Sequence, residues 1–145
     1  NRQDLPAPTF FDVVSPSIAI YFVCYNNSTE LWRKFQSVAR QLGDKYSLAD
    51  LENVIWEVYE LKKREVFERL GEPWRLFGAY FELADWMGHA FMAKKRKIWK
   101  TYHELDNLAK TIKKETENTI FLVISDHGMK IGKDGITGTH TSTAF

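Results

Sequence analysis

Three stretches of the chain have the residue pattern of β-strands. Residues 18–25 and 120–125 are continuous apolar or β-favouring runs without a charged residue, a pattern typical of strands buried on both faces of a sheet. Residues 74–83 are rich in aromatic side chains and bounded by turn residues, which predicts a third strand that ends at Asp85. The two continuous runs therefore indicate a sheet with both of its faces covered.

Between these stretches, apolar residues recur at helical spacing. Helices are predicted over residues 28–42, 48–70 and 90–117, and a glycine just beyond each of the first two would end it. Two residue pairs have a spacing that suits a helix start: Asn27 with Glu30, and Ser47 with Asp50. The order strand, helices, strand, helix, strand predicts an α/β fold, with a mostly parallel sheet flanked by helices and joined by right-handed crossovers.

The composition describes a globular chain without a strong overall charge. Its 145 residues are enough for one domain, and a formal net charge of +1 gives no global field to recruit nucleic acid or an anionic membrane. The longest apolar run, residues 18–25, is too short to cross a bilayer, and no signal-peptide pattern is visible, which predicts a cytoplasmic location. The single cysteine, Cys24, excludes an internal disulfide framework and is expected to be a small core residue.

The two ends of the sequence indicate a piece of a longer polypeptide. The chain starts in a polar segment without a methionine, and residues 143–145 look like the beginning of a strand. We therefore expect the sheet to be incomplete in this chain and the true N-terminus to lie upstream of Asn1.

Carboxylate and imidazole groups gather at the ends of predicted strands or in the loop beyond them: Asp85 with His89, Asp126 with His127, and His140. Such positions form the ligand crevice of open α/β sheets. Carboxylate and imidazole together suit zinc or manganese, and several of them on adjacent strand ends suit a site with two metal ions. The alternative for each residue alone is an ordinary polar group in a surface turn. The fourth histidine, His103, is expected on the surface of a helix.

A basic run at residues 94–97 leaves two interpretations open. Its four consecutive lysine and arginine side chains could bind nucleic acid or phosphate groups. A solvated helix face is the favoured interpretation, because the run lies on a predicted helix and acidic residues balance it elsewhere. We therefore expect neither a nucleic-acid patch nor a membrane segment.

Several short segments together resemble one enzyme family. Residues 81–89 are similar to the Y-x-x-x-x-D-x-x-G-H segment of type I phosphodiesterases and nucleotide pyrophosphatases, which belong to the alkaline phosphatase superfamily. Residues 122–129 resemble the V-x-S-D-H-G-M segment closely, and residues 138–140 resemble the later G-x-H metal-binding element. Weaker resemblances cover residues 102–106 and 5–12. The segments follow the order of the family, which is more specific than any one of them alone.

This resemblance implies metal-dependent hydrolysis of phosphodiester or pyrophosphate bonds. By their positions in the motifs, Asp85, His89 and His140 would hold one metal ion. Asp126 and His127 would help to hold a second. The resemblance implies two divalent ions, zinc foremost and manganese as the alternative, and a small-molecule phosphodiester or nucleotide as the substrate.

The resemblance also implies how the chain is organised. Residues 1–145 would form part of a single alkaline-phosphatase-like metallohydrolase domain, in which residues 26–72 would be a helical insertion or cap. The order of the family places its Thr or Ser nucleophile upstream of Leu5, so the catalytic residue is unknown and this chain alone is expected to be inactive. Phosphomonoesterases, sulfatases and phosphoglycerate mutases of the same superfamily are alternatives within the enzyme class. An inactive domain that keeps the metal site or binds partners is the alternative of another class.

Overall fold

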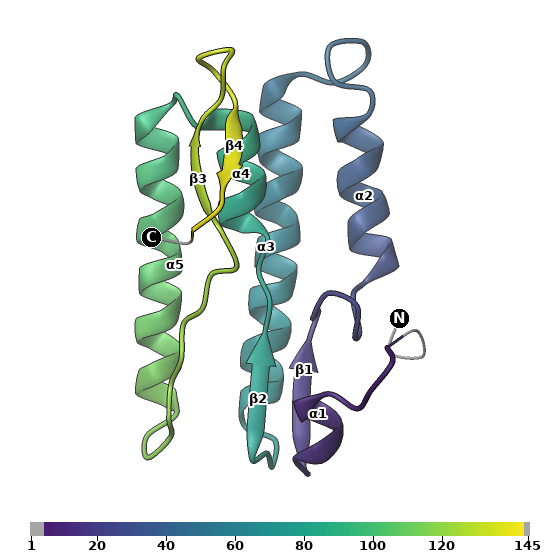
Figure 1. Ribbon diagram of the computed structural model, residues 1–145, viewed down its shortest axis with the longest axis vertical. Helices are drawn as coiled ribbons and strands as arrows, with labels where there is room; N and C mark the ends of the chain where they lie inside the picture. Colours follow the sequence, from purple (N-terminus) through teal and green to yellow (C-terminus); the bar gives the residue numbers. More distant parts are fainter. Residues whose placement is uncertain (1–4, 144–145) are drawn as a thin grey trace. The chain divides into compact units, whose positions relative to one another are not determined.

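The computed structural model describes residues 5–143. The chain divides into two compact units, the first of which extends to Glu82 while the second begins at Leu83. Figure 1 labels the helices and strands of both units in chain order. Within residues 5–143, no helix is long and apolar enough to cross a membrane.

The first unit combines a two-stranded sheet with three helices. β1 (Ser17–Ile20) and β2 (Leu76–Ala79) pair in parallel, and α1 (Phe10–Val13) packs against β1. The long helix α3 (Leu48–Leu70) also contacts β1, and α2 (Thr29–Ala39) packs along α3 (Figure 1). The buried apolar side chains of β1 and α3 are Ile18, Ala19, Ile20, Leu51, Val54, Ile55, Val58, Tyr59 and Val66.

Local sequence alone determines where α3 begins. The Ser47 hydroxyl accepts a hydrogen bond from the Asp50 N–H, and the Asp50 carboxylate accepts bonds from the backbone N–H and the hydroxyl of Ser47. This reciprocal arrangement satisfies donors that an N-terminus leaves without intrahelical partners. The backbone bond, and then the hydroxyl bond, hold the pKa of Asp50 below its usual value. The predicted helix over residues 48–70 is confirmed at both ends.

Substitution of this cap should be measurable. We expect Ser47→Ala to lower the free energy of unfolding by about 1 kcal/mol, because the Asp50 N–H loses its acceptor. Urea denaturation followed by far-UV circular dichroism would measure the change. The bonds to the Asp50 carboxylate are lost as the pH falls through its lowered pKa, so the difference from the wild type should shrink in acid. The control Ser37→Ala, inside α2, should change little, and an equal loss in both variants would contradict the capping argument.

The first predicted strand is shorter than the sequence indicates. β1 ends at Ile20, because Tyr21 and Cys24 have positive φ angles of 54° and 64° and the chain turns there. The Asn26 side chain fixes this turn by donating to the Ala19 carbonyl and accepting from the Phe22 N–H. Cys24 is exposed in the turn, so the prediction that it is a core residue is wrong.

The helix predicted over residues 28–42 is present as α2, but it ends earlier than predicted, at Ala39. Its N-cap is Ser28, whose hydroxyl accepts from the Leu31 N–H, rather than the predicted Asn27.

The second unit places two helices beside a hairpin. α4 (Leu83–Phe91) packs against α5 (Lys95–Glu115) and against the antiparallel pair β3 (Gly128–Ile131) and β4 (Gly138–Thr141) (Figure 1). The buried residues of α4 are Leu83, Trp86, Met87, Gly88 and Phe91. The short helix α4 is therefore the centre of this unit.

Two predictions around α4 are wrong. Of the strand predicted over residues 74–83, only β2 (Leu76–Ala79) is observed. Asp85 lies inside α4 rather than at the end of a strand. The predicted helix over residues 90–117 is two helices, because the Ala93 N–H donates to the Ile136 carbonyl in the β3–β4 turn instead of continuing a helix. The second correction depends on a contact between residues that are distant in sequence.

The strand predicted over residues 120–125 is absent from the described structure. These residues have no regular secondary structure, and Ile120 and Ile124 are 91% and 84% exposed. A strand needs hydrogen-bonding neighbours, and within residues 5–143 the sheets pair only β1 with β2 and β3 with β4. The apolar run is therefore not enough to form a strand here.

The mixed α/β class is confirmed, whereas a full parallel sheet is not observed. Within the described residues the parallel sheet has two strands, and the other pair is an antiparallel hairpin that the sequence pattern does not predict. Residues 5–9, which include Pro6 and Pro8, form neither helix nor strand. The strand start predicted at residues 143–145 lies mostly outside the described range.

Candidate metal centre

Helix α4 presents the first two candidate ligands. Asp85 and His89 are four residues apart in the helix, so both side chains lie on one face. Asp85 Oδ1 lies 3.3 Å from His89 Nε2. The apolar residues Trp86, Met87 and Phe91 occupy the buried side of α4, which leaves the face of Asp85 and His89 accessible.

The β3–β4 hairpin brings His140 and His127 to this face. His140 lies in β4, and its Nε2 is 2.8 Å from His89 Nε2 and 3.0 Å from Asp85 Oδ1. His127 lies just before β3, with its ring 3.6 Å from the His140 ring, centroid to centroid, and its Nε2 3.8 Å from Asp85 Oδ1. The second unit therefore brings together three histidines and one aspartate. The most distant pair in the sequence, Asp85 and His140, is 55 residues apart.

A close approach of backbones makes this convergence possible. A Cβ on Gly138 would collide with the Gly88 carbonyl and with the Met129 side chain, and a Cβ on Gly88 would lie 2.6 Å from Met129 Sδ. Glycine at both positions lets β4 lie directly against α4. Because His89 and His140 follow these glycines within one or two residues, the packing sets the distance between their rings.

Backbone carbonyls orient two of the imidazoles. His89 Nδ1 lies 3.1 Å from the Gly138 carbonyl oxygen, and His127 Nδ1 lies 3.2 Å from the Gly128 carbonyl oxygen. A carbonyl only accepts, so each contact requires the proton on Nδ1 and leaves Nε2 of the neutral ring with a free lone pair. In His89 this lone pair faces Asp85 and His140, which is the tautomer that metal-binding histidines adopt.

The donor set fits a divalent metal ion. The three atoms Asp85 Oδ1, His89 Nε2 and His140 Nε2 form a triangle with sides of 2.8, 3.0 and 3.3 Å. Ligand atoms in a tetrahedral zinc site, each about 2.0–2.1 Å from the ion, lie roughly 3.3 Å apart. One carboxylate and two imidazoles are also a donor set that zinc prefers in proteins. These three residues could therefore hold one ion after small side-chain adjustments.

Asp126 lies at the margin of this cluster. Its side chain is 71% exposed, and its Oδ1 is 3.7 Å from His127 Nε2 and accepts a bond from the His127 N–H. The group that converges on one point consists of Asp85, His89 and His140. The structure thus brings together Asp85, His89, His140 and His127, and it places Asp126 beside His127 but pointing to solvent.

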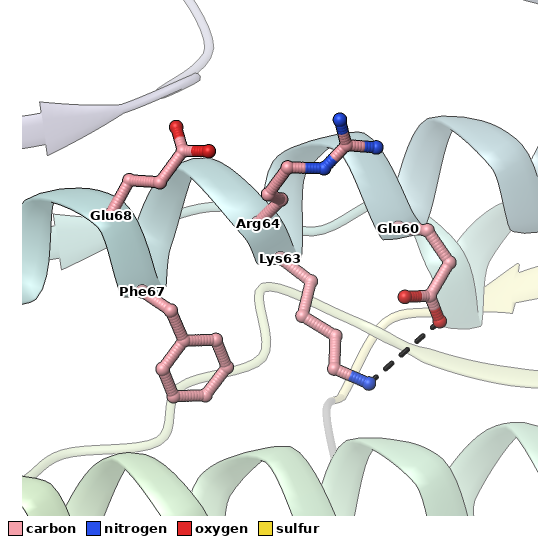
Figure 2. A pocket seen from close by; sticks show the side chains of 5 residues that line it. All are labelled: Glu60, Lys63, Arg64, Phe67 and Glu68. Atoms are coloured by element: carbon pink, nitrogen blue, oxygen red, sulfur yellow. Dashed lines mark ion pairs between the residues drawn. The ribbon is translucent and has the colours of Figure 1, made fainter.

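A separate hollow of about 520 Å³ lies along α3 in the first unit. Figure 2 shows its lining side chains, which are Glu60, Lys63, Arg64, Phe67 and Glu68. Lys63 Nζ is 3.7 Å from Glu60 Oε1, and the two acidic residues are matched by two basic ones. The hollow contains no imidazole or thiol, so it does not offer the donor set found on α4 and β4.

The sequence of the chain matches the profile of a known family. A sequence profile described as type I phosphodiesterase / nucleotide pyrophosphatase matches residues 8–141. The chain belongs to this family. Searches of curated proteins and of solved structures gave no match. The family is metal-dependent, and the Asp85, His89 and His140 group is where this member could bind a metal ion.

Sequence reasoning missed two parts of this family member's centre. It placed Asp85 and His89 on a turn after a strand, whereas a helix holds them four residues apart. It also missed the carbonyl oxygens of Gly138 and Gly128, which orient His89 and His127. A glycine close to a histidine in each motif was the available signal, because glycine permits the approach of another backbone.

The glycine contact gives a prediction for this phosphodiesterase-family chain. We expect Gly138→Ala to lower the free energy of unfolding by about 2 kcal/mol and to weaken zinc binding, because the new Cβ must push β4 away from the Gly88 carbonyl. Urea denaturation and zinc titration calorimetry would measure the two effects. Gly71→Ala is the matched control, since its φ is −82° and a Cβ there meets open space. Wild-type zinc affinity in Gly138→Ala would contradict the packing argument.

Proposed function

We propose that this protein hydrolyses phosphodiester or pyrophosphate bonds with the help of two divalent metal ions. The observation that supports it is the convergence of Asp85, His89 and His140 in a chain that belongs to the type I phosphodiesterase / nucleotide pyrophosphatase family. The substrate in this proposal is a small-molecule phosphodiester or nucleotide.

Each residue of the centre has a distinct part in the proposal. Asp85 contributes the negative charge, and His89 and His140 contribute neutral nitrogen donors, which together hold the first ion. The Gly138 carbonyl keeps His89 in the tautomer that can bind a metal. A bound ion would supply a Lewis acid that offsets charge on the phosphoryl oxygens and lowers the pKa of an oxygen nucleophile.

The second ion is assigned to His127 and Asp126. The His127 ring is stacked on His140 at an angle of 22°, and the Gly128 carbonyl fixes its Nδ1, so its Nε2 is available beside the first group. Asp126 is exposed and adjacent, and a rotation of its side chain would bring a second carboxylate to the same ion. No attacking hydroxyl is assigned to residues 5–143 in this proposal.

The proposal extends to the organisation of the chain. We assign residues 1–145 to one metallohydrolase domain and residues 26–72, which contain α2 and α3, to a helical insertion or cap. Zinc is the proposed ion because the histidine-rich donor set suits it, and manganese is the alternative.

The test uses the complete gene product that contains these residues. After removal of metal with a chelator, zinc or manganese should restore hydrolysis of bis(p-nitrophenyl) phosphate, with slower hydrolysis of p-nitrophenyl phosphate and p-nitrophenyl sulfate. Faster turnover of the monoester or the sulfate would assign the centre to another activity of the superfamily. Zinc binding without turnover of any of the three would contradict the enzymatic proposal and favour an inactive metal-binding domain.

A further inference from the structure

The outward side of α5 carries a cationic and aromatic surface, which we call the α5 face. It consists of Lys95, Arg96, Trp99, Lys100 and His103, all of them exposed. These residues are three or four positions apart along two helical turns, so they share one side of the helix. The opposite side of α5, which includes the buried Thr101 and Leu108, belongs to the core of the unit.

Two aromatic rings, those of Trp99 and His103, are stacked on each other on the α5 face, and we call this pair the platform. The Trp99 side chain is 67% exposed, and its ring lies parallel to the His103 ring, at an angle of 8° and a centroid distance of 4.9 Å. A large apolar ring with so much surface in water loses the free energy that its burial would give. A planar ligand that stacks on the platform would recover that free energy.

The charged residues that precede the platform in the sequence have one sign. Between Met92 and Glu104 the sequence contains five lysine and arginine residues and no aspartate or glutamate. Lys97 turns inward, with its ammonium group 4.5 Å from the Phe91 ring centroid, while Lys95, Arg96 and Lys100 are exposed. The overall net charge of +1 therefore conceals a local positive region, which complements a polyanion.

We propose that the α5 face binds single-stranded nucleic acid. Such ligands are bound by aromatic side chains on which bases stack, together with cations that contact the phosphates. The α5 face combines both features, with the Trp99–His103 platform flanked by Arg96 and Lys100. This departs from the sequence-based expectation of a plain solvated helix, because only the structure shows that the two rings are exposed and stacked.

Two other polyanions fit the α5 face less well. An anionic membrane is bound by helices that expose a broad apolar side, and the apolar side of α5 is used in packing against α4. Duplex DNA presents phosphates but keeps its bases stacked on each other, so the ring platform would have no partner. The proposal goes beyond hydrolysis at the metal centre and requires no metal ion.

The binding test uses a fluorescein-labelled oligothymidylate of about 15 nucleotides, within the range of known site sizes, in the presence of a chelator. Fluorescence anisotropy should show binding by the wild type, and Trp99→Ala should weaken it about fivefold or more. Trp99→Phe should retain most of the binding, because a ring remains. Arg96→Gln should also reduce the slope of log affinity against log salt by about 0.7.

Matched controls separate the α5 face from general effects. Lys113→Gln removes one charge from the last turn of the same helix, and Trp32→Ala removes an exposed ring from α2, so both should bind nearly as the wild type does. Equal binding by the wild type and Trp99→Ala would overturn the proposal. Tighter binding to a duplex, or Trp99-dependent binding only to phosphatidylserine vesicles, would also overturn it.

Discussion

His140→Ala is expected to weaken zinc binding by more than about a hundredfold, beyond the 10–100-fold loss that follows removal of a group that only orients a ligand. His140 Nε2 is 2.8 Å from His89 Nε2 and 3.0 Å from Asp85 Oδ1, so its loss removes one corner of the donor triangle. The two remaining donors, both from α4, cannot complete a tetrahedral site without further protein ligands. Zinc titration calorimetry of the metal-free protein would measure the change in Kd.

Folding and metal binding can be separated in this variant. The His140 side chain is 46% exposed, so its truncation should leave the free energy of unfolding of the metal-free protein nearly unchanged. His103→Ala is the matched control, because it also removes one imidazole but from the exposed side of α5. Equal zinc affinities in the two variants would show that the cluster on α4 and β4 is not the metal centre. In the complete gene product, metal-dependent hydrolysis should be lost only in His140→Ala.

Glu82→Ala is expected to lower the free energy of unfolding by about 3–5 kcal/mol, the cost of leaving a buried charge without its partner. Lys62 is 2% exposed in α3, and its ammonium group forms an ion pair with the Glu82 carboxylate. The ammonium group also lies 3.5 Å from the Tyr80 carbonyl oxygen, 4.9 Å from the centroid of the Tyr21 ring and 5.9 Å from that of the Tyr80 ring, and none of these groups carries a full negative charge. Burial and the hydrogen bond to Glu65 raise the pKa of Tyr21, so its ring stays neutral.

The pH dependence of this variant has a definite sign. Burial lowers the pKa of Lys62, and the Glu82 carboxylate opposes that shift. Without Glu82 the pKa should fall further, and between the folded and unfolded pKa values the unfolded chain binds more protons than the folded one. The free energy of unfolding of Glu82→Ala should therefore rise as the pH increases from the lowered pKa of Lys62 toward the ordinary lysine pKa of about 10.4.

Urea denaturation at a series of pH values would measure both effects, and two further variants complete the test. Glu57→Ala breaks the exposed pair with Lys34 and should cost no more than about 1 kcal/mol. The double change Lys62→Met with Glu82→Leu removes both charges together and should be close to the wild type in stability. Equal small losses for Glu82→Ala and Glu57→Ala would show that Lys62 reaches water once its partner is removed.

The accuracy of sequence reasoning differs along the chain for identifiable physical reasons. α3 was predicted at both ends because its cap, its apolar spacing and the glycine after it act within a few residues. The strand predicted over residues 120–125 was wrong because a strand depends on neighbours distant in sequence, and the described residues provide none. The break between α4 and α5 was missed because it depends on a bond from Ala93 to Ile136.

The candidate centre shows the same division. The types of residue and their order identified the family and selected Asp85, His89, Asp126, His127 and His140, because metal chemistry limits which side chains can serve as ligands. The tertiary structure alone decided that Asp85 and His89 share a helix face, and that β4 brings His140 against that face through the Gly88–Gly138 contact. Whether a side chain can bind a metal is a property of the residue itself. The distances between the candidate donor atoms depend on how α4 and β4 pack, and the linear sequence does not contain those distances.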